Sequence, residues 1–384
     1  MYINFWYPIC TSAELQATEP VAAQIFGLQY VAFRDTEGVP HVLANTCVHR
    51  GGSLARGTVK DGCIVCPYHG WRYGGDGKCQ LVPSFEEGSK IPTRAKVDSY
   101  PVKEQYGIVF AFLGDLPEEQ RPPMYEIEEY GDEAWREHEL ILLDINCYYE
   151  RSMENGVDFV HNEFVHPIQA SPKPIPGTVK FPETPWGSGV TSKMIEMGRK
   201  PSGDEAMESD PNVLNAGSWH HGPNTLITWI TFGENRSLHQ YFFEAPVDNE
   251  HTKVFFLNLR SFMLEPEHDK QIHDANLRVT VEDIVILEGL SPIRTPETRT
   301  REILTPGDKP VARYRDFLDE WNAKGWRIDT KALQENRGDI AYAIPCPDRR
   351  NSGNWVLDSV PLLPATNKIS SADLQFDPSS SQQA

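Results

Sequence analysis

Two pairs of residues between positions 47 and 69 offer the atoms that a metal centre needs. Cys47 and His49 form a C-x-H pair, and Cys66 and His69 form a C-x-x-H pair that starts seventeen residues after His49. Cysteine sulfur and histidine nitrogen bind zinc in structural sites and iron in clusters. A zinc finger usually takes its cysteines as one pair and its histidines as another, whereas each pair here mixes both. Mixed pairs are expected where two cysteines hold one iron and two histidines hold another, so the spacing favours an iron–sulfur cluster.

The residues around these four ligands support the same interpretation. Gly51, Gly52 and Gly70 let the backbone turn closely around an inorganic sulfide, which can then accept hydrogen bonds from backbone amides. A zinc ribbon that uses Cys63 and Cys66 is the alternative, but no second C-x-x-C pair is present to complete it. The signature C-x-H-x16-C-x-x-H, with its flanks CVHRGG and CPYHGWRY, resembles that of Rieske proteins. The resemblance implies a [2Fe-2S] cluster held by Cys47, His49, Cys66 and His69.

A second group of candidate ligands lies about a hundred residues later, in the stretch INCYYERSMENGVDFVHNEFVHP (145–167). Helical spacing fits most of this stretch. On a regular α-helix, however, five residues turn the chain through about 500°, so His161 and His166 would point about 140° apart and could not share one ion. Pro167 disfavours the α conformation of the residue before it. We therefore expect the helix to distort, or to end at His166, so that the second imidazole can turn back.

The pattern N-x-x-D-x-x-H-x4-H, which begins at Asn155, resembles the mononuclear-iron motif of Rieske non-haem iron oxygenases. In that family two histidines and one carboxylate hold Fe(II) on one face and leave other positions open for O₂ and substrate. The resemblance implies that His161 and His166 are iron ligands. It also implies that Asp158 bridges a cluster histidine of a neighbouring subunit to an iron histidine and so carries electrons between subunits.

The third iron ligand is expected in the stretch PEHDKQIHDANLRVTVEDIVILEGL (266–290), which has a helical pattern and an acidic end. Glu282, Asp283 and Glu288 compete for this role. Related oxygenases take the ligand from a Glu-Asp pair that is followed a few residues later by Glu, and VEDIVILEGL resembles that pattern with Asp283 as the ligand. The alternative is a solvated acidic helix face without a metal, which is common in proteins.

Three further histidines lie in or beside strand-like runs later in the chain. His220 and His221 are adjacent, so on a strand they would point to opposite faces. We assign no metal to them or to His239, although a substrate contact stays open for either member of the adjacent pair.

The elements that must position the cluster ligands are short strands. From Met1 to about Asp115, runs such as VAFRD, HVLAN, CIVCP and GIVFAFLGD alternate with Gly, Pro and Asp, which predicts a small all-β module with the cluster loops at one tip. We expect the segment up to Glu14 to pack as an N-terminal extension. The stretch PEEQRPP (117–123) indicates a linker or turn out of the module.

The iron ligands need helices and a supporting sheet. Residues 308–326 predict a helix that starts at Asp308 and Pro310 and ends at Gly325. Aromatic and β-branched runs at 225–232, 237–247 and 252–262 predict three antiparallel strands behind the iron. Residues 168–217 show no steady period and indicate loops that could form a lid. Residues 364–384 contain few large apolar side chains and indicate a disordered tail.

The composition bounds the function. The chain has 384 residues and a net charge of −19, which argues against a nucleic-acid partner. Seven cysteines are an odd number, which does not suggest a disulfide framework and favours a reducing, cytoplasmic location. The aromatic N-terminus lacks the charge and apolar core of a signal peptide, and no run of about eighteen apolar residues predicts a membrane span.

The resemblance covers both redox sites and implies the terminal oxygenase (alpha) subunit of a Rieske system. We expect an α+β chain with a Rieske [2Fe-2S] domain at 1–120, a helix-grip catalytic domain at 121–363 that holds a mononuclear Fe(II), and the tail. The family forms trimers and draws electrons from a flavin/iron–sulfur reductase or a ferredoxin. A separate donor fits this chain, because it contains no G-x-G-x-x-G fingerprint for a nucleotide.

The expected reaction is hydroxylation or oxidative demethylation of a small, largely apolar, aromatic or alicyclic substrate. The chain is closer in size to single-subunit members that monooxygenate, and ring cis-dihydroxylation is the second choice. A non-catalytic Rieske electron-transfer protein is an alternative of another class, which the histidine pair disfavours. Apolar pocket residues are expected among the aromatic side chains of the strands, where half of each strand faces away: Trp229, Phe232, Tyr241, Phe242 and Phe255.

Overall fold

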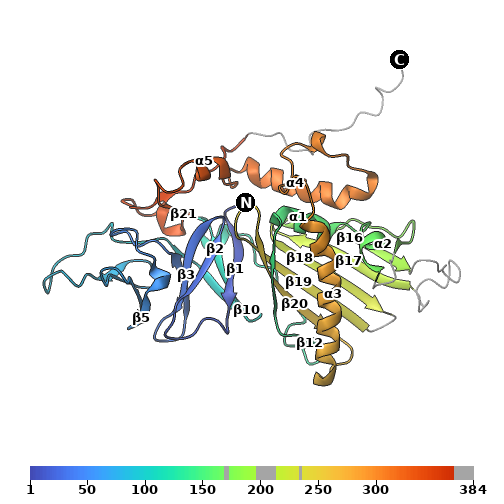
Figure 1. Ribbon diagram of the computed structural model, residues 1–384, viewed down its shortest axis with the longest axis horizontal. Helices are drawn as coiled ribbons and strands as arrows, with labels where there is room; N and C mark the ends of the chain where they lie inside the picture. The colour runs from blue at the N-terminus through green and yellow to red at the C-terminus, as the bar shows by residue number, and fades with distance from the viewer. Residues whose placement is uncertain (168–172, 196–212, 233–235, 367–384) are drawn as a thin grey trace, which may run out of the picture.

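The computed structural model describes residues 1–167, 173–195, 213–232 and 236–366. Figure 1 shows a β-rich N-terminal module (blue to cyan) at one end of the long axis, and a large sheet (green to yellow) with helix α3 lying across it at the other. The α+β architecture expected from the sequence, an all-β module followed by a helix-grip domain, is confirmed.

The N-terminal module consists of three small antiparallel sheets. The first has the order β1-β11-β10, the second β2-β3-β4-β9 and the third β5-β6-β7-β8. Their strands are β1 Phe5–Thr11, β2 Val21–Ile25, β3 Leu28–Arg34, β4 Pro40–Ala44, β5 Thr58–Lys60, β6 Cys63–Val65, β7 Arg72–Tyr73, β8 Cys79–Leu81, β9 Ser99–Tyr100, β10 Val102–Gln105 and β11 Ile108–Leu113.

The N-terminal segment is more than the extension expected from the sequence. Every residue of β1 is buried, and β1 pairs along its length with β11. Its residues FWYPICT are mostly apolar and are buried in the hydrophobic core. The segment is therefore a strand of the N-terminal module and not an extension packed on its surface.

The second region is built on one nine-stranded antiparallel sheet. Its main path runs β12-β20-β19-β18-β17-β16-β14, while β13 pairs with β20 and β15 with β16. The three strands expected from aromatic runs are present as β18, β19 and β20. The strands are β12 Arg136–Glu137, β13 Ile141–Ile145, β14 Lys173–Pro174, β15 Glu183–Thr184, β16 Gly187–Ile195, β17 Val213–His221, β18 Thr225–Phe232, β19 Arg236–Pro246 and β20 Thr252–Arg260.

The expectation of loops throughout 168–217 was wrong for the part that the structure describes. β14, β15, β16 and the first half of β17 fall there. The sequence GSGVTSKMI contains two Gly and one Lys, and VLNAGSWHH contains Asn, Ala and Gly, residue types that are depleted in strands. Pairing on both sides within the sheet outweighs that propensity. The remainder of the expected lid, 168–172 and 196–212, lies outside the described residues.

The described residues contain five α-helices, and the helices expected near 145–167, 266–290 and 308–326 are all present. They are α1 Tyr149–Val157, α2 Asn162–Val165, α3 Asp269–Leu287, α4 Lys309–Ala323 and α5 Thr330–Glu335. A 3-10 turn, Pro306–Asp308, precedes α4, and Thr305 caps it in a reciprocal pair with Asp308. Among the described residues, no helix combines the length and the apolar character that crossing a membrane requires.

Helix α3 has an unusual distribution of side chains. Its fully buried residues are Asn276, Thr280 and Leu287, two of which are polar. On its outer side Val281, Val285 and Ile286 are 47%, 66% and 46% exposed. A helix of a soluble monomer normally buries its apolar stripe. The inner side of α3 therefore faces a polar space, and its outer side is apolar.

The chain returns to the N-terminal module after α5, through the short pair β21 Tyr342–Ala343 and β22 Asp358–Ser359 and the 3-10 turn Pro347–Arg350. Asp98 is fully buried and accepts hydrogen bonds from Arg349 at 2.6 and 2.7 Å. The hydroxyl of Tyr100 donates to the carbonyl of Ile344. One hydrophobic core contains side chains from both modules. The domain limits 1–120 and 121–363 stay a prediction. The segment 341–363, although it falls in the second range, packs against the N-terminal module through Asp98 and Tyr100.

Candidate metal centres

The break between α1 and α2 positions the two candidate iron histidines. Helix α1 ends at Val157, and Asp158 is extended, with φ −74° and ψ 130°. His161 then caps the one-turn helix α2, which His166 follows. The break was expected at His166, before Pro167, but α1 already ends at Val157, nine residues before His166. The two histidines therefore flank the separate short helix α2. This arrangement brings their Nε2 atoms within 3.3 Å of each other.

Asp283 completes a triangle with the two histidines. Its Oδ1 lies 3.5 Å from Nε2 of His161 and 3.3 Å from Nε2 of His166. Metal–ligand bonds of about 2.1 Å place neighbouring ligand atoms about 3.0 to 3.4 Å apart, and opposite ligands about 4.2 Å apart. The three edges of the triangle, 3.3 to 3.5 Å, are near the spacing of neighbouring ligands and well short of that of opposite ligands. The donor set therefore fits one face of a single metal ion, with the other face free for exchangeable ligands.

Two further side chains orient this triangle. Asn155 donates from Nδ2 to Oδ1 of Asp283 at 3.0 Å. Glu282 lies 3.0 Å from Nδ1 of His166, the ring nitrogen that faces away from the triangle. A carboxylate at that position fixes the tautomer that offers Nε2 to a metal. Glu288, the other carboxylate in competition, accepts from Asn146 and lies outside the triangle.

The electrostatics of the triangle favour a cation. Burial alone would lower the pKa of His161, but the carboxylates of Asp158 and Asp283 outweigh it and raise the pKa to about 9. Burial would raise the pKa of Asp283, but hydrogen bonds from His161 and His166 outweigh it and hold the pKa well below its usual range. Protons thus occupy the imidazoles where a metal ion would bind, and a metal must displace them.

Asp158 lies beside the triangle and not in it. Its Oδ2 is 3.7 Å from Nδ1 of His161, on the ring edge opposite Nε2. That nitrogen is buried and has no hydrogen-bond partner. The side chain of Asp158 is 22% exposed, so it touches both the histidine and the surface. Its role as an inter-subunit bridge stays a prediction.

The four candidate cluster ligands converge at the tip of the N-terminal module. Cys47 and Cys66 are buried, whereas His49 and His69 are exposed, with ring centroids 4.4 Å apart. The loops turn at Gly51 and Gly70, which have φ of +72° and +70°. A Cβ on Gly52 would come within 2.9 Å of Sγ of Cys66, so only glycine fits against that sulfur.

Two aromatic side chains support these ligands. The hydroxyl of Tyr73 lies 3.1 Å from Sγ of Cys47. Trp71 stacks on the ring of His49, with centroids 4.7 Å apart and planes 3° from parallel. Sulfur ligands inside and imidazoles outside suit a cluster with one buried and one exposed iron.

The spacing of the four ligands disfavours a single zinc. In a tetrahedral site, ligand atoms lie within about 4 Å of one another. Among the described residues, the one group of three or more His, Cys, Asp or Glu side chains with ligand atoms all within 4.8 Å is His161, His166 and Asp283. No three of the N-terminal ligands therefore close on one ion, which fits two metal positions. Cys63, the partner in the zinc-ribbon alternative, is a half-buried free thiol.

The three histidines of the strand region have protein partners. His220 is fully buried, 3.0 Å from the hydroxyl of Ser188, and packs on Tyr314. His221 points the other way, to the carbonyl of Pro123. His239 contacts Glu129.

The strand aromatics divide between the two faces of the sheet. Gln240 reaches α3, which identifies the face that carries the iron candidates. By alternation and register, Phe232 and Phe242 lie on this face. The other three expected pocket residues, Trp229, Tyr241 and Phe255, lie on the opposite face and do not line it.

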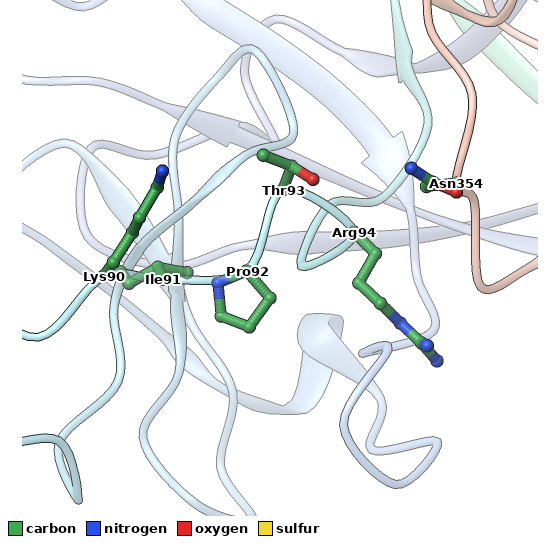
Figure 2. A pocket seen from close by; sticks show the side chains of 6 residues that line it. All are labelled: Lys90, Ile91, Pro92, Thr93, Arg94 and Asn354. Atoms are coloured by element: carbon green, nitrogen blue, oxygen red, sulfur yellow. The ribbon is translucent and has the colours of Figure 1, made fainter.

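A surface hollow of about 480 Å³ lies elsewhere, on the N-terminal module. Figure 2 shows its lining, the loop residues Lys90, Ile91, Pro92, Thr93 and Arg94 with Asn354 of the C-terminal segment. It contains neither set of candidate metal ligands.

Known families match both regions of the chain. Residues 5–101 match the Rieske [2Fe-2S] domain, and residues 145–324 match the C-terminal domain of vanillate O-demethylase oxygenase. The first region contains all four candidate cluster ligands, and the second contains all three members of the triangle.

Similar proteins span both regions. The chain is 28% identical over 354 residues to methylxanthine N1-demethylase NdmA of Pseudomonas putida, which covers 83% of this chain and 88% of that protein. It is also 28% identical to the chloroplastic chlorophyllide a oxygenase of Chlamydomonas reinhardtii over 85% of this chain, but it spans only 49% of that relative's length.

The fold matches a solved oxygenase. Apo dicamba monooxygenase superposes with a TM-score of 0.67 over 88% of this chain and 99% of that one, at 18% identity. An identity this low shows likeness of fold alone. Together, the two matched domains and these relatives show that the chain belongs to the Rieske non-haem iron oxygenases, as a terminal oxygenase (alpha) subunit, with a [2Fe-2S] cluster and a mononuclear non-haem iron as its cofactors.

Proposed function

We propose that this chain uses O₂, and electrons from a separate donor, to hydroxylate or oxidatively demethylate a small, largely apolar substrate. One observation carries the proposal. A triangle of two imidazoles and one carboxylate, with one face free, occurs in the same chain as a Cys₂His₂ cluster tip. Non-haem iron enzymes that activate O₂ use this donor set.

The ligands divide between two groups. We assign Cys47, His49, Cys66 and His69 to the cluster, and His161, His166 and Asp283 to the mononuclear iron. The bound iron would supply O₂ activation, and the cluster would supply single electrons. The chain's own residues hold and orient these groups: Glu282 fixes the tautomer of His166, and Asn155 fixes the carboxylate of Asp283.

We propose a head-to-tail homotrimer in which Asp158 links the cluster of one copy to the iron of another. Strand β5 of the cluster tip and helix α2 of the iron site lie toward opposite ends of the molecule (Figure 1). Around the iron candidates the surface is apolar: Phe164 is 78% exposed and Val285 is 66% exposed. Tyr68, beside the exposed cluster histidines, is 56% exposed. An apolar patch of this kind supports burial against another copy.

We extend the proposal to the electron donor and the cellular location. We assign a flavin/iron–sulfur reductase or a ferredoxin as donor and the cytoplasm as location; the seven cysteines, all within the described residues, form no disulfide. We also propose residues 1–120 as the cluster domain and 121–363 as the catalytic domain.

Metal and sulfide analysis tests the proposal. Anaerobically purified chain should contain about three irons and two sulfides. Two irons with two sulfides would instead indicate an electron carrier, and one zinc without sulfide would indicate a structural site. A substrate screen under ¹⁸O₂ then separates monooxygenation, with one labelled oxygen in the product, from cis-dihydroxylation, with two.

A further inference from the structure

Two buried amide side chains beneath α3 have unpaired hydrogen-bonding atoms. Asn258 of β20 is 2% exposed and Asn276 of α3 is 6% exposed. Oδ1 of Asn258 and Nδ2 of Asn276 have no partner in the structure. A buried polar atom without a partner is costly, so native proteins rarely keep one unless a water or a ligand completes it.

These amides belong to a row of polar side chains that crosses the sheet. Thr228, Gln240 and Asn258 are cross-strand neighbours on β18, β19 and β20. The Thr228 hydroxyl donates to Oε1 of Gln240 at 2.8 Å, and Nε2 of Gln240 donates to Oδ1 of Asn276 at 3.2 Å. Cross-strand neighbours have Cβ atoms about 5 Å apart, so Asn258 and Asn276 both adjoin Gln240.

The hydrogen bonds in the structure show which atom of each amide is free. Nδ2 of Asn258 donates to the backbone carbonyl of His239 at 3.2 Å, which can only accept, so Oδ1 is the free atom. Oδ1 of Asn276 accepts from Gln240, so Nδ2 is the free atom. The row therefore offers one free acceptor and one free donor, each on a neighbour of Gln240.

The row lies on the iron side of the sheet. Asn276 precedes Asp283 by seven residues on the same helix, and Thr280, which is also buried, lies between them. Seven residues span about 10 Å along a helix. Thr228 and Gln240 are only half-buried, so the row is partly accessible from outside. One or two fused rings would fill the distance from the iron triangle to the amides.

We propose that Asn258 and Asn276 recognise the substrate, and that this substrate carries an adjacent N–H donor and C=O acceptor, as in a lactam or imide ring. Asn276 donates to the ligand carbonyl, and Asn258 accepts from the ligand N–H. The inference rests on the proposed function, because it assigns the substrate specificity of the same site.

Three probes of similar shape test the pairing: 2-quinolinone, N-methyl-2-quinolinone and naphthalene. Calorimetric binding to the iron-loaded enzyme without an electron donor measures recognition apart from turnover. The wild-type protein should bind 2-quinolinone about tenfold or more tightly than either of the other two, because each of those leaves at least one buried amide unpaired. Equal affinities for all three would overturn the inference and would mean that the amides hold only a bridging water.

Variants separate the two contacts. Asn276→Leu should reduce the preference for 2-quinolinone over naphthalene, because only the contact of Asn258 with the ligand N–H remains. Asn258→Leu should remove the preference over the N-methyl probe, which keeps the carbonyl and lacks only the N–H. Gln271→Leu, an exposed amide on α3, is the matched control and should keep both preferences. A variant at 276 that keeps the wild-type preference would overturn the assignment of that residue. If either core variant fails to fold, the wild-type comparison of the three probes still decides.

The outcomes distinguish this inference from the function on which it rests. Enzyme that oxidises substrates but binds all three probes equally would overturn the inference alone. Enzyme with full metal content that shows the expected preferences but oxidises nothing would contradict the proposed function and support the recognition row.

Discussion

Nε2 of His161 and Nε2 of His166 lie 3.3 Å apart, although the two residues are five positions apart in the sequence. A continuous helix would have turned one imidazole away from the other, since the two would point about 140° apart. The extended conformation of Asp158 ends α1 and lets α2 start in a new direction. The same residue thus ends the helix and contacts the histidine.

Asp283→Ala should remove the mononuclear iron and leave the cluster. Iron content is expected to fall from about three to about two per chain, with sulfide unchanged at about two. Activity should be lost with the iron. Glu288→Ala, which removes the competing carboxylate outside the triangle, is the control and should keep all three irons. If the iron content of the Asp283 variant is unchanged, Asp283 is not the third ligand and Glu282 becomes the candidate.

Glu282→Gln should weaken iron binding without abolishing it. The carboxylate lies 3.0 Å from Nδ1 of His166, and loss of such a partner typically lowers metal affinity by about 10 to 100-fold. Competition with a chelator measures the change, with the exposed Glu250→Gln as control. An affinity equal to wild type would mean that the contact does not orient the ring.

Asp158→Ala should keep both metal centres but stop turnover. Its side chain is 3.7 Å from His161 and does not enter the triangle, so metal content should stay at wild-type values. When the chemically reduced variant is mixed with substrate and O₂, the cluster should stay reduced. Hydroxylation at the normal rate would contradict the inter-subunit electron path.

Val285→Glu should break the oligomer without unfolding the chain. Val285 is 66% exposed in the single chain, so a charge there costs little within one copy. A charge buried against another copy without a partner would cost far more. Light scattering should show smaller species, and activity should fall while metal content stays constant. Lys270→Glu, at the distant exposed end of α3, should leave assembly unchanged.

Glu244→Gln should remove a pH dependence of stability. Burial raises the pKa of Glu244 to about 8, from an ordinary value of 4.5. The folded state therefore binds this proton more tightly, and its contribution is full below about pH 4.5 and is lost as the pH rises to about 8. The slope cannot exceed about 1.4 kcal/mol per pH unit.

The variant is neutral at every pH, so its stability relative to wild type should increase between pH 5 and pH 8. Glutamine can still accept the hydrogen bond from Ser152. Denaturant unfolding across this range measures the difference, with the exposed Glu250→Gln as control. Parallel profiles for the Glu244 variant and wild type would show that the carboxyl is ionised when folded.

Features that depend on neighbouring residues in the chain were predicted correctly from the sequence. Ligand spacing, helix caps and apolar strands depend on neighbours in the chain, and they predicted both metal motifs and the helices α3 and α4. The strands β16 and β17 were missed because their Gly, Asn, Ala and Lys residues have low strand propensity, which pairing across the sheet outweighs. The side of a strand on which Trp229 or Phe242 lies depends on the register with distant strands, which local pattern does not contain.

The contacts of Glu282 and Asn155 could be found only in three dimensions. Each lies next to, or in the same motif as, a candidate ligand, and a sequence signal was therefore present. The signal did not say which carboxylate of the acidic run would meet the triangle and which would reach the ring behind it. The unpaired atoms of Asn258 and Asn276 gave no signal at all, because they are defined by missing partners.

The contacts that hold the N-terminal module against the rest of the chain restrict the path of electron transfer. The ion pair of Asp98 with Arg349 and the buried strand β1 hold the N-terminal module from both sides of residues 117–123. A swing of the cluster tip about that linker would have to break both contacts. Under the proposed function, the electron reaches the iron from the cluster of a neighbouring copy. The rate of electron transfer then depends on the fixed distance between that cluster and the iron, and not on a movement of the N-terminal module within one chain.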